Sequence, residues 1–413
     1  MTVKRFCFDE TDVAREIDHV KGLIRSHQEN LEVLEQIIAR QGVANVDLHF
    51  RKAALEDDLA ASWNRLRDLE ARMKGLSITN SLQVITEILY THLPSGVLDL
   101  YDPATMPLLE YGIFNNTGKS VTFVLMSEIE DFSFSRSDTV NIAPNTERIV
   151  YQLPRLKTDK AKVLTDIRRA VVHTCVKYLE DGREHLLQQQ DSDIYLMARN
   201  VIRWAIPDVV KGSGYKPLLE HIAAWVTPRA EPVKQMLREA VEYNPKHAMW
   251  GYQGAPNPQT ARIQVKAIYQ ALKLVGKLAY VNSPFAIGSK NGEVRQAVRL
   301  PTESLSERSA NCIDGAVLYA SLMELAALEP LVVIKTGHAF VGWKTWQGAN
   351  DYEFIETTMT LTEPFEKSFK RGMEEYLDLR DTGWFEREVF DSGGFARLLD
   401  IKALHDAGIY PME

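Results

Sequence analysis

The stretch SANCIDGAVLYASLM, residues 309–323, begins with small and polar residues and continues with apolar residues at helical spacing. This pattern predicts a helix that starts at Cys312 and carries its apolar positions on repeating turns, at Ala316, Leu318, Leu322 and Leu325. The first N–H groups of a helix have no partner inside it, and the helix dipole favours negative charge there. A cysteine at this position is therefore placed to form a reactive thiolate.

A thiolate of this kind needs a base and an acid that orients the base, and one candidate for each follows along the chain. His338 comes directly after a glycine in KTGHAFVGWKTW, residues 335–346, and begins an apolar and aromatic strand. Glu356 ends the next strand-like run in NDYEFIETTMT, residues 350–360. Neighbouring strands can present both side chains on one sheet face. The sequence thus predicts a catalytic set of Cys312, His338 and Glu356, in which the acid orients the imidazole.

Other side chains near this set have simpler explanations. A cysteine on an apolar helix is most often a small buried hydrophobe, and only the combination of the three residues in this order favours chemistry at Cys312. Asp314 is expected to stabilise the helix N-terminus and not to react. Cys7 and Cys175 receive no role, because three widely spaced cysteines without a C-x-x-C pair indicate free thiols and neither a disulfide framework nor a zinc site.

The segments NCIDGAV, GHAFVGW and FIETT together resemble the transglutaminase-like superfamily. Its papain-like core places a cysteine at a helix N-terminus and a histidine and an acid on adjacent strands. The acid of that family typically lies in a D-x-T segment, which here reads Glu356-Thr357-Thr358, with glutamate in place of aspartate. VRLP, residues 298–301, fits a bacterial branch, and the similarity spans roughly residues 215 to 360.

The resemblance implies acyl transfer through a thioester, without a metal ion or a cofactor. The developing oxyanion needs hydrogen-bond donors. The backbone N–H of Cys312 is one, and by the resemblance Gln296 is the side-chain candidate. Trp343 is expected to form a wall of the substrate cleft. We expect a cysteine protease or amide hydrolase acting on a protein or peptide, with a protein-crosslinking transglutaminase or amidase, and a non-catalytic interaction scaffold, as the alternatives.

The first part of the chain, residues 1–78, shows apolar residues at alternating steps of four and three. This is the seam of a coiled coil, and it occurs twice, before and after a break at Gln41-Gly42. The pattern predicts an antiparallel helical hairpin that packs on the chain, on a second copy or on a partner. The seam positions are Val13, Ile17, Val20, Ile24, Leu31, Leu34 and Ile38, and then Leu48, Leu55, Leu59, Leu66, Leu69, Met73 and Leu76.

Residues 79–200 consist of short β-rich runs separated by turn residues such as Asn-Asn-Thr-Gly and Asp-Gly. This spacing predicts an immunoglobulin-like β-sandwich that holds or positions other parts of the chain. Residues 201–413 read as an α+β domain of the transglutaminase-like type. Its helices are expected at 215–226, 231–243 and 260–281 and after Cys312, and its strands at 331–336, 339–346 and 352–358.

The composition of the 413 residues limits the partners. A net charge of −8 gives no electrostatic footprint for nucleic acid, and no apolar run is long enough to cross a bilayer. MTVKRFCFDE at the N-terminus lacks the features of a secretory signal, so the expected location is the cytoplasm. The α+β multidomain layout, with a hairpin ahead of a hydrolase, is similar to bacterial effectors, and it predicts activity gated by a protein partner or by self-association, in antiviral defence.

Overall fold

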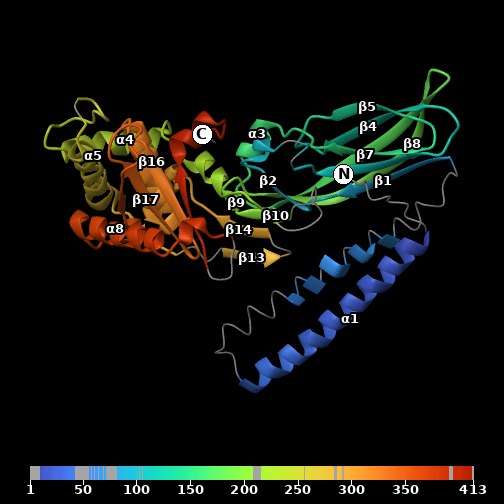
Figure 1. The fold of residues 1–413 in the computed structure, drawn as a ribbon, viewed down its shortest axis with the longest axis horizontal. Coiled ribbons are helices and arrows are strands. Elements are labelled where there is room, and N and C mark those ends of the chain that lie inside the picture. The colour runs from blue at the N-terminus through green and yellow to red at the C-terminus, as the bar shows by residue number, and fades with distance from the viewer. Residues whose placement is uncertain are drawn as a thin grey trace. The chain divides into compact units, whose positions relative to one another are not determined.

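A computed structural model describes residues 10–41, residues 55–70 except 57, 60, 64 and 68, and residues 81–411 except 102, 105, 208–214, 255, 283–285, 291–292 and 390–393. The chain is an α+β protein with several sheets (Figure 1). It divides into two compact units, and no helix in the described part of the chain is both long and apolar enough to cross a membrane. The first unit consists of residues 1–198, 207–215 and 288–294, and the second of residues 199–206, 216–287 and 295–413.

The first unit begins with helix α1, Glu10–Gln41, and the described residues between 55 and 70 are helical as well. Apolar side chains of the two segments form one buried cluster, made of Ile17, Val20, Ile24, Leu66 and Leu69 with Leu59 against it. These are positions of the predicted seam. Arg65 forms an ion pair with Glu16, which also links the two segments. The connection after Gln41 and the predicted positions Leu48, Met73 and Leu76 lie outside the described residues, as do the side chains of Val13, Leu34 and Ile38.

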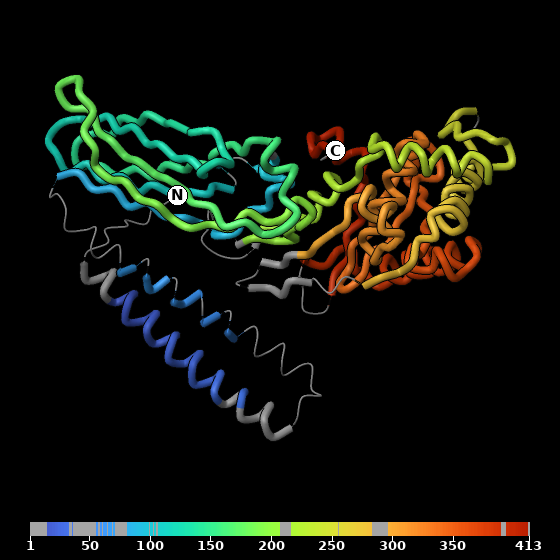
Figure 2. Tube along the Cα trace, turned by 180° about the vertical axis from the view of Figure 1, so that it is seen from behind, coloured from blue at the N-terminus to red at the C-terminus, as the bar shows by residue number. Residues whose placement is uncertain are grey.

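Two antiparallel sheets follow in the same unit. One has the strand order β1-β3-β6 and the other β2-β8-β7-β4-β5, in which only the β2–β8 pair is parallel. Figure 2 shows the long β7–β8 hairpin in green. The strands are β1 Leu82–Ile88, β2 His92–Pro94, β3 Leu109–Asn115, β4 Val121–Ile129, β5 Arg136–Ile142, β6 Thr146–Gln152, β7 Arg168–Glu180 and β8 Arg183–Met197, with short helices η1 Leu98–Leu100 and α3 Thr158–Lys162.

The two sheets share a buried core. Residues of β3 and β4 alternate between buried and partly exposed, as expected for strands with one face inside. Gln152 of β6 links the layers, because its amide nitrogen donates to the Leu125 carbonyl at 3.0 Å and its oxygen accepts from the Ser127 hydroxyl at 2.7 Å. A buried amide that is satisfied across two sheets fixes their register against each other.

The second unit is built on an antiparallel sheet with the strand order β18-β17-β16-β19. In Figure 1, β16 and β17 lie among the helices α4, α5 and α8. The sheet strands are β16 Pro330–Lys335, β17 His338–Lys344, β18 Tyr352–Ile355 and β19 Ala396–Asp400. The helices are η2 Leu219–Trp225, α4 Glu231–Glu242, α5 Pro258–Ala271, the π-helical turn η3 Leu272–Gly276, α6 Pro301–Glu307, α7 Cys312–Leu325, η4 Thr357–Met359, α8 Phe365–Asp381, η5 Trp384–Glu386 and α9 Ile401–Asp406.

Helices cover both faces of this sheet. Phe340 and Phe354 form one cluster with Leu379 of α8, while α7 packs against β16 and β17. Because side chains alternate along a strand, the buried Val341 and Ile355 face away from the α8 cluster. The remaining strands in the described part of the chain are short. They are β9 Val201–Arg203, β10 Ala205–Pro207, β11 Tyr215–Pro217, β12 Ala279–Tyr280, β13 Ala286–Lys290, β14 Glu293–Ala297 and β15 Ser309–Ala310.

Most predicted elements of this unit are confirmed, and two are wrong. The three predicted strands and the helix at Cys312 are present. The helix expected to reach Val281 ends at Ala271, because a π turn follows and Lys277 adopts a left-handed conformation with φ 48°, after which the chain forms β12. The segment expected as a helix at 215–226 is instead β11 followed by a 3₁₀ helix. A fourth strand, β19, was not predicted.

Candidate functional site

Cys312 is the first residue of α7 and is partly exposed. Asn311 caps the helix: its side-chain oxygen accepts a hydrogen bond from the Asp314 N–H at 2.9 Å, while the Asp314 carboxylate accepts one from the Asn311 N–H at 3.0 Å. This reciprocal capping box fixes the first turn of the helix. The role predicted for Asp314 at the helix N-terminus is confirmed. The sulfur is thus carried by a rigid helix start, close to unpaired N–H groups.

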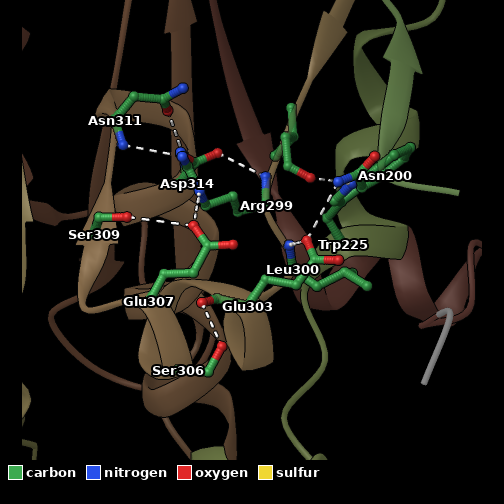
Figure 3. A network of polar contacts seen from close by, with 11 residues as sticks. Asn200, Trp225, Arg299, Leu300, Glu303, Ser306, Glu307, Ser309, Asn311 and Asp314 are labelled. Carbon is green, nitrogen blue, oxygen red and sulfur yellow. Dashed lines mark hydrogen bonds and ion pairs between the residues drawn. The ribbon is translucent and has the colours of Figure 1, made fainter. Parts of the chain in front are cut away.

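Asp314 also anchors the helix start to the preceding segment. It is fully buried, and Arg299 binds it twice, through its backbone N–H at 2.8 Å and through its guanidinium at 2.9 Å (Figure 3). Burial raises the pKa of Asp314, although the hydrogen bonds from Asn311 and Arg299 act in the opposite direction. Arg299 binds Glu307 of α6 in addition, at 2.7 Å. The VRLP segment therefore holds the cysteine-bearing helix in place.

His338 is the first residue of β17 and follows a tight turn from β16. Lys335 pairs with His338, so Thr336 and Gly337 form the turn, and Gly337 has the positive φ of 76° that glycine adopts without strain. The His338 Nε2 lies 2.7 Å from the Glu356 Oε2. The histidine side chain is 22% exposed and that of the glutamate 6%, so this ion pair is largely shielded from water.

Glu356 follows the last residue of β18 and caps η4. Its second carboxylate oxygen accepts two hydrogen bonds from Thr358, one from the N–H at 2.9 Å and one from the hydroxyl at 2.7 Å. Burial alone would raise the pKa of Glu356, but the hydrogen bonds from His338 and Thr358 outweigh it, and the pKa lies below its ordinary value. The carboxylate is therefore ionised at neutral pH and fixed on both oxygens.

The imidazole of His338 joins Glu356 to Cys312. Burial would lower the pKa of His338, but its hydrogen bonds with Cys312 and Glu356, and the negative charge of both groups, raise this pKa to about 10. Since Nε2 bonds to Glu356, Nδ1 is the ring nitrogen available to the sulfur. The three residues predicted from the sequence are thus brought together, with the imidazole in its protonated form at neutral pH.

A close contact between the backbone of α7 and the side chain of Thr357 keeps the acid and the cysteine at this spacing. Gly315 of α7 lies against Thr357, and a Cβ atom at this glycine would be 2.9 Å from the Thr357 Oγ1. The same hydroxyl donates a hydrogen bond of 3.4 Å to the Cys312 carbonyl. The first turn of α7 and the residue after Glu356 are therefore in direct contact.

A pocket of about 420 Å³ opens beside the ion pair, and it contains the residues that could hold a cation. Ligand atoms of His338, Glu356 and Glu375 lie within 4.8 Å of one another. Glu375, however, already binds the Lys335 ammonium at 2.9 Å and has Arg371 at 3.7 Å. A metal ion would compete with these two cations and with the proton on His338, so the charges at this pocket disfavour a metal. The pocket is lined by Lys335, His338, Glu356, Thr358, Met359, Arg371 and Glu375.

The two remaining predicted residues are not placed with this set. Gln296 lies on β14, and its side-chain oxygen accepts a hydrogen bond from the Trp204 indole at 3.1 Å. Trp343 is completely buried and packs against Phe369 of α8, with ring centroids 6.2 Å apart. On β17 it alternates to the face opposite His338. Trp343 is therefore a core residue and does not form a cleft wall.

Several residues of the site were missed by the sequence analysis. Asn311 could have been found, because asparagine directly before a helix is a standard capping signal. Thr358 could have been found as a hydroxyl two residues after the acid. Glu375 carries no such local signal, since it reaches the site through the contact of α8 with Lys335.

No known family model matches this chain, and no curated protein sequence matches it.

Proposed function

We propose that this protein is a cysteine-dependent acyl-transfer enzyme of the transglutaminase-like type, and that its reaction is the hydrolysis of an amide bond in a protein or peptide. The observation that carries the proposal is the state of His338, an imidazolium held between the Glu356 carboxylate and the Cys312 sulfur at a helix start. A purely structural histidine in a core has no need of a charged partner on each side.

The chemistry follows from these three groups. The Cys312 thiolate attacks the amide carbonyl, and the backbone N–H of Cys312 at the helix start is a donor for the oxyanion. The His338 imidazolium transfers its proton to the leaving amine, which leaves a thioester on the sulfur. Water, deprotonated by the neutral imidazole, then cleaves the thioester, which releases the carboxylic acid and restores the thiolate and the imidazolium. Glu356 keeps the ring oriented through both steps.

The proposal is tested first at the sulfur. Iodoacetamide is expected to alkylate Cys312 at mildly acidic pH, where ordinary thiols are protonated, and His338→Ala should remove this reactivity. Cys175, a free and partly exposed cysteine in the first unit, provides the matched control in the same molecule. Mass spectrometry of the two cysteine peptides across pH measures both. Equal pH dependence of Cys312 and Cys175 would identify the second unit as a non-catalytic scaffold.

The reaction itself is tested in cells that produce the wild-type protein or the Cys312→Ala variant. Hydrolysis predicts new protein termini that depend on Cys312, with a loss of roughly 10³-fold or more in the variant. A crosslinking transglutaminase would instead yield new isopeptide bonds without new termini. Proteome-wide mapping of termini and crosslinked peptides distinguishes the two acceptors, water and amine.

The rest of the chain is proposed to regulate this enzyme. We propose that residues 1–78 form an antiparallel coiled-coil hairpin, that residues 79–200 form an immunoglobulin-like sandwich, and that residues 201–413 form the hydrolase domain. The buried cluster that joins α1 to residues 55–70 supports the hairpin, and the Gln152 link between two sheets supports the sandwich. In this proposal the hairpin binds a protein partner or a second copy, and the enzyme acts in the bacterial cytoplasm as a gated defence effector.

A further inference from the structure

The strand β12, Ala279–Tyr280, lies directly beside the chain segment that leads into Cys312. It runs parallel to β15, Ser309–Ala310, with Tyr280 opposite Ala310. The N–H of Ala279 donates to the Arg308 carbonyl at 2.9 Å, and the N–H of Val281 donates to the Ala310 carbonyl at 3.0 Å. In a parallel ladder only every second residue bonds to a given neighbour. The N–H and the C=O of Tyr280 therefore point to the opposite edge of β12.

This edge is open in the part of the chain that the structure describes, where the sheet consists of β12 and β15. The side chain of Tyr280 is 50% exposed and that of Val281 43%. Two neighbouring apolar side chains at an unpaired strand edge are a feature that proteins usually avoid, because such an edge pairs with other extended chains. This edge is therefore a candidate binding site for an extended chain.

The edge adjoins the reactive groups on two sides. Through β15 it is two residues from Cys312, and β12 also contacts η4, the turn that follows Glu356. Burial raises the pKa of Tyr280, and the negative charges of Cys312 and Glu356 raise it further. The phenol is thus close enough to sense the charge of the reactive sulfur, and it keeps its proton, as a hydrogen-bond donor, at neutral pH.

We propose that the edge of β12 binds the acyl-donor substrate as an added strand: the N–H and C=O of Tyr280 pair with the substrate main chain, and the ring of Tyr280 contacts an apolar residue next to the bond that Cys312 attacks. This inference rests on the proposed function and names its substrate class. An extended polypeptide presents main-chain donors and acceptors that match those of a strand edge. A compact folded surface and a small free amide do not present such a row of groups.

The proposal specifies what the substrate must be. It is an unfolded or exposed segment of a protein, extended over a few residues, with an aliphatic or aromatic side chain beside the scissile bond. Tyr280 is a specificity-determining residue in this arrangement, because its ring supplies apolar contact area and its backbone sets the register of the substrate.

Binding is measured without catalysis, using the full-length Cys312→Ala protein and a short fluorescein-labelled peptide with Val, Leu and Phe at its centre. Fluorescence anisotropy is expected to show binding, and adding Tyr280→Ala should weaken it roughly ten- to hundredfold. Tyr280→Phe keeps the ring and the backbone, so it should bind within a few-fold of the parent. Tyr243→Ala, at an exposed tyrosine that ends α4, is the matched control and should not change binding.

Two further probes separate the possible outcomes. A peptide with Asp and Lys in place of the central apolar residues, and a peptide with N-methylated central amides, should each bind poorly, because the first lacks the apolar side chain and the second cannot pair with a strand. The inference would be overturned if all peptides bound equally well. It would also be overturned if Tyr280→Ala changed neither the binding nor the melting temperature. Alkylation of Cys312 across pH in the wild-type protein tests the proposed function without any peptide, so the failure of the proposed function and the failure of this inference are distinguishable.

Discussion

At the scale of single residues, the site is defined by the charge on one imidazole. His338 lies between the Glu356 carboxylate and the Cys312 sulfur, and its pKa of about 10 lies well above its ordinary value of 6.5, although burial acts in the opposite direction. The ring is therefore a cation at neutral pH, and it carries the proton that a leaving amine needs. Glu356 differs from the aspartate of the related motif by one methylene, and its two bonds with Thr358 fix the longer side chain.

The first prediction at this scale concerns the variant Glu356→Gln. A neutral amide keeps the shape of the side chain but removes the charge that stabilises the imidazolium, so the pKa of His338 should fall from about 10 toward 6.5. The imidazolium is the acid in the proposed mechanism. The alkaline limit of kcat/KM should therefore lie near pH 10 in the wild type and move to lower pH in the variant.

A pH–rate profile with a peptide substrate measures this shift, and NMR of the His338 ring protons measures the ring directly. Glu374→Gln is the control, because Glu374 is an exposed residue of α8 that pairs with Lys370. Its profile should coincide with that of wild type. An unchanged alkaline limit in Glu356→Gln would mean that Glu356 does not hold the proton on the ring.

At the scale of elements, the sequence predicted the sheet strands and the helix at Cys312 because each carries a strong local pattern. Asn311 and Cys312 stand at a sharp change from polar to apolar residues, and the glycine before His338 marks a turn. The same local reasoning extended the helix after Thr260 too far, because apolar spacing continues through the π turn, and the left-handed Lys277 that ends it has no clear sequence signal.

Elements that depend on distant partners could not be predicted. β19 is a strand of only five residues that is defined by its pairing with β16. β12 has two residues, and its position next to Cys312 results from a parallel pairing across about 30 residues of chain. Trp343 was misjudged for a similar reason, since its burial depends on the contact with Phe369 of α8. The proximity of His338 and Glu356 to Cys312 could be predicted from the sequence, whereas the position of β12 beside Cys312 could not.

The contact between α7 and η4 leads to a prediction for Gly315→Ala. Alanine favours a helix by up to about 1 kcal/mol over glycine. The added methyl group would, however, lie 2.9 Å from the Thr357 Oγ1 and 3.1 Å from its Cβ, so helix and turn must separate. We expect a net loss of about 1–2 kcal/mol in the free energy of unfolding, together with a drop in kcat of about tenfold or more, because Glu356 adjoins the displaced residue.

Chemical denaturation and steady-state kinetics measure the two effects. Gly22→Ala in α1 is the matched control, because no atom of the described residues outside the helix's own nearby backbone lies within 4 Å of the added methyl group. It should be neutral or stabilising and leave kcat unchanged. Replacing Thr357 by glycine in the Gly315→Ala background removes the clash and should restore part of kcat. A Gly315→Ala protein with wild-type kcat would show that the spacing of α7 and η4 is not critical.

At the scale of the whole molecule, Cys312, His338 and Glu356 belong to the second unit, whereas the helical segments at the start of the chain belong to the first. Their shared cluster is small, and Leu69 at its centre is 1% exposed. Two large apolar side chains of the same segments remain exposed, Leu23 at 40% and Trp63 at 45%. A small helical pair with exposed apolar residues is suited to associate with another chain.

The last prediction therefore concerns Leu69→Asp. A carboxylate in this cluster has no partner and should unfold the helical pair, with a cost of about 3 kcal/mol or more. If the pair mediates self-association that gates the enzyme, the wild-type protein sediments as an oligomer and the variant as a monomer with a changed rate of peptide cleavage. Alkylation of Cys312 should be the same in both, because the reactive set lies entirely in the second unit.

Leu186→Asp, at a 60% exposed leucine of β8, is the matched control and should behave as wild type. A monomeric wild-type protein whose cleavage rate Leu69→Asp leaves unchanged would exclude self-gating through these helices, and a partner protein would then have to be sought for the exposed residues Leu23 and Trp63.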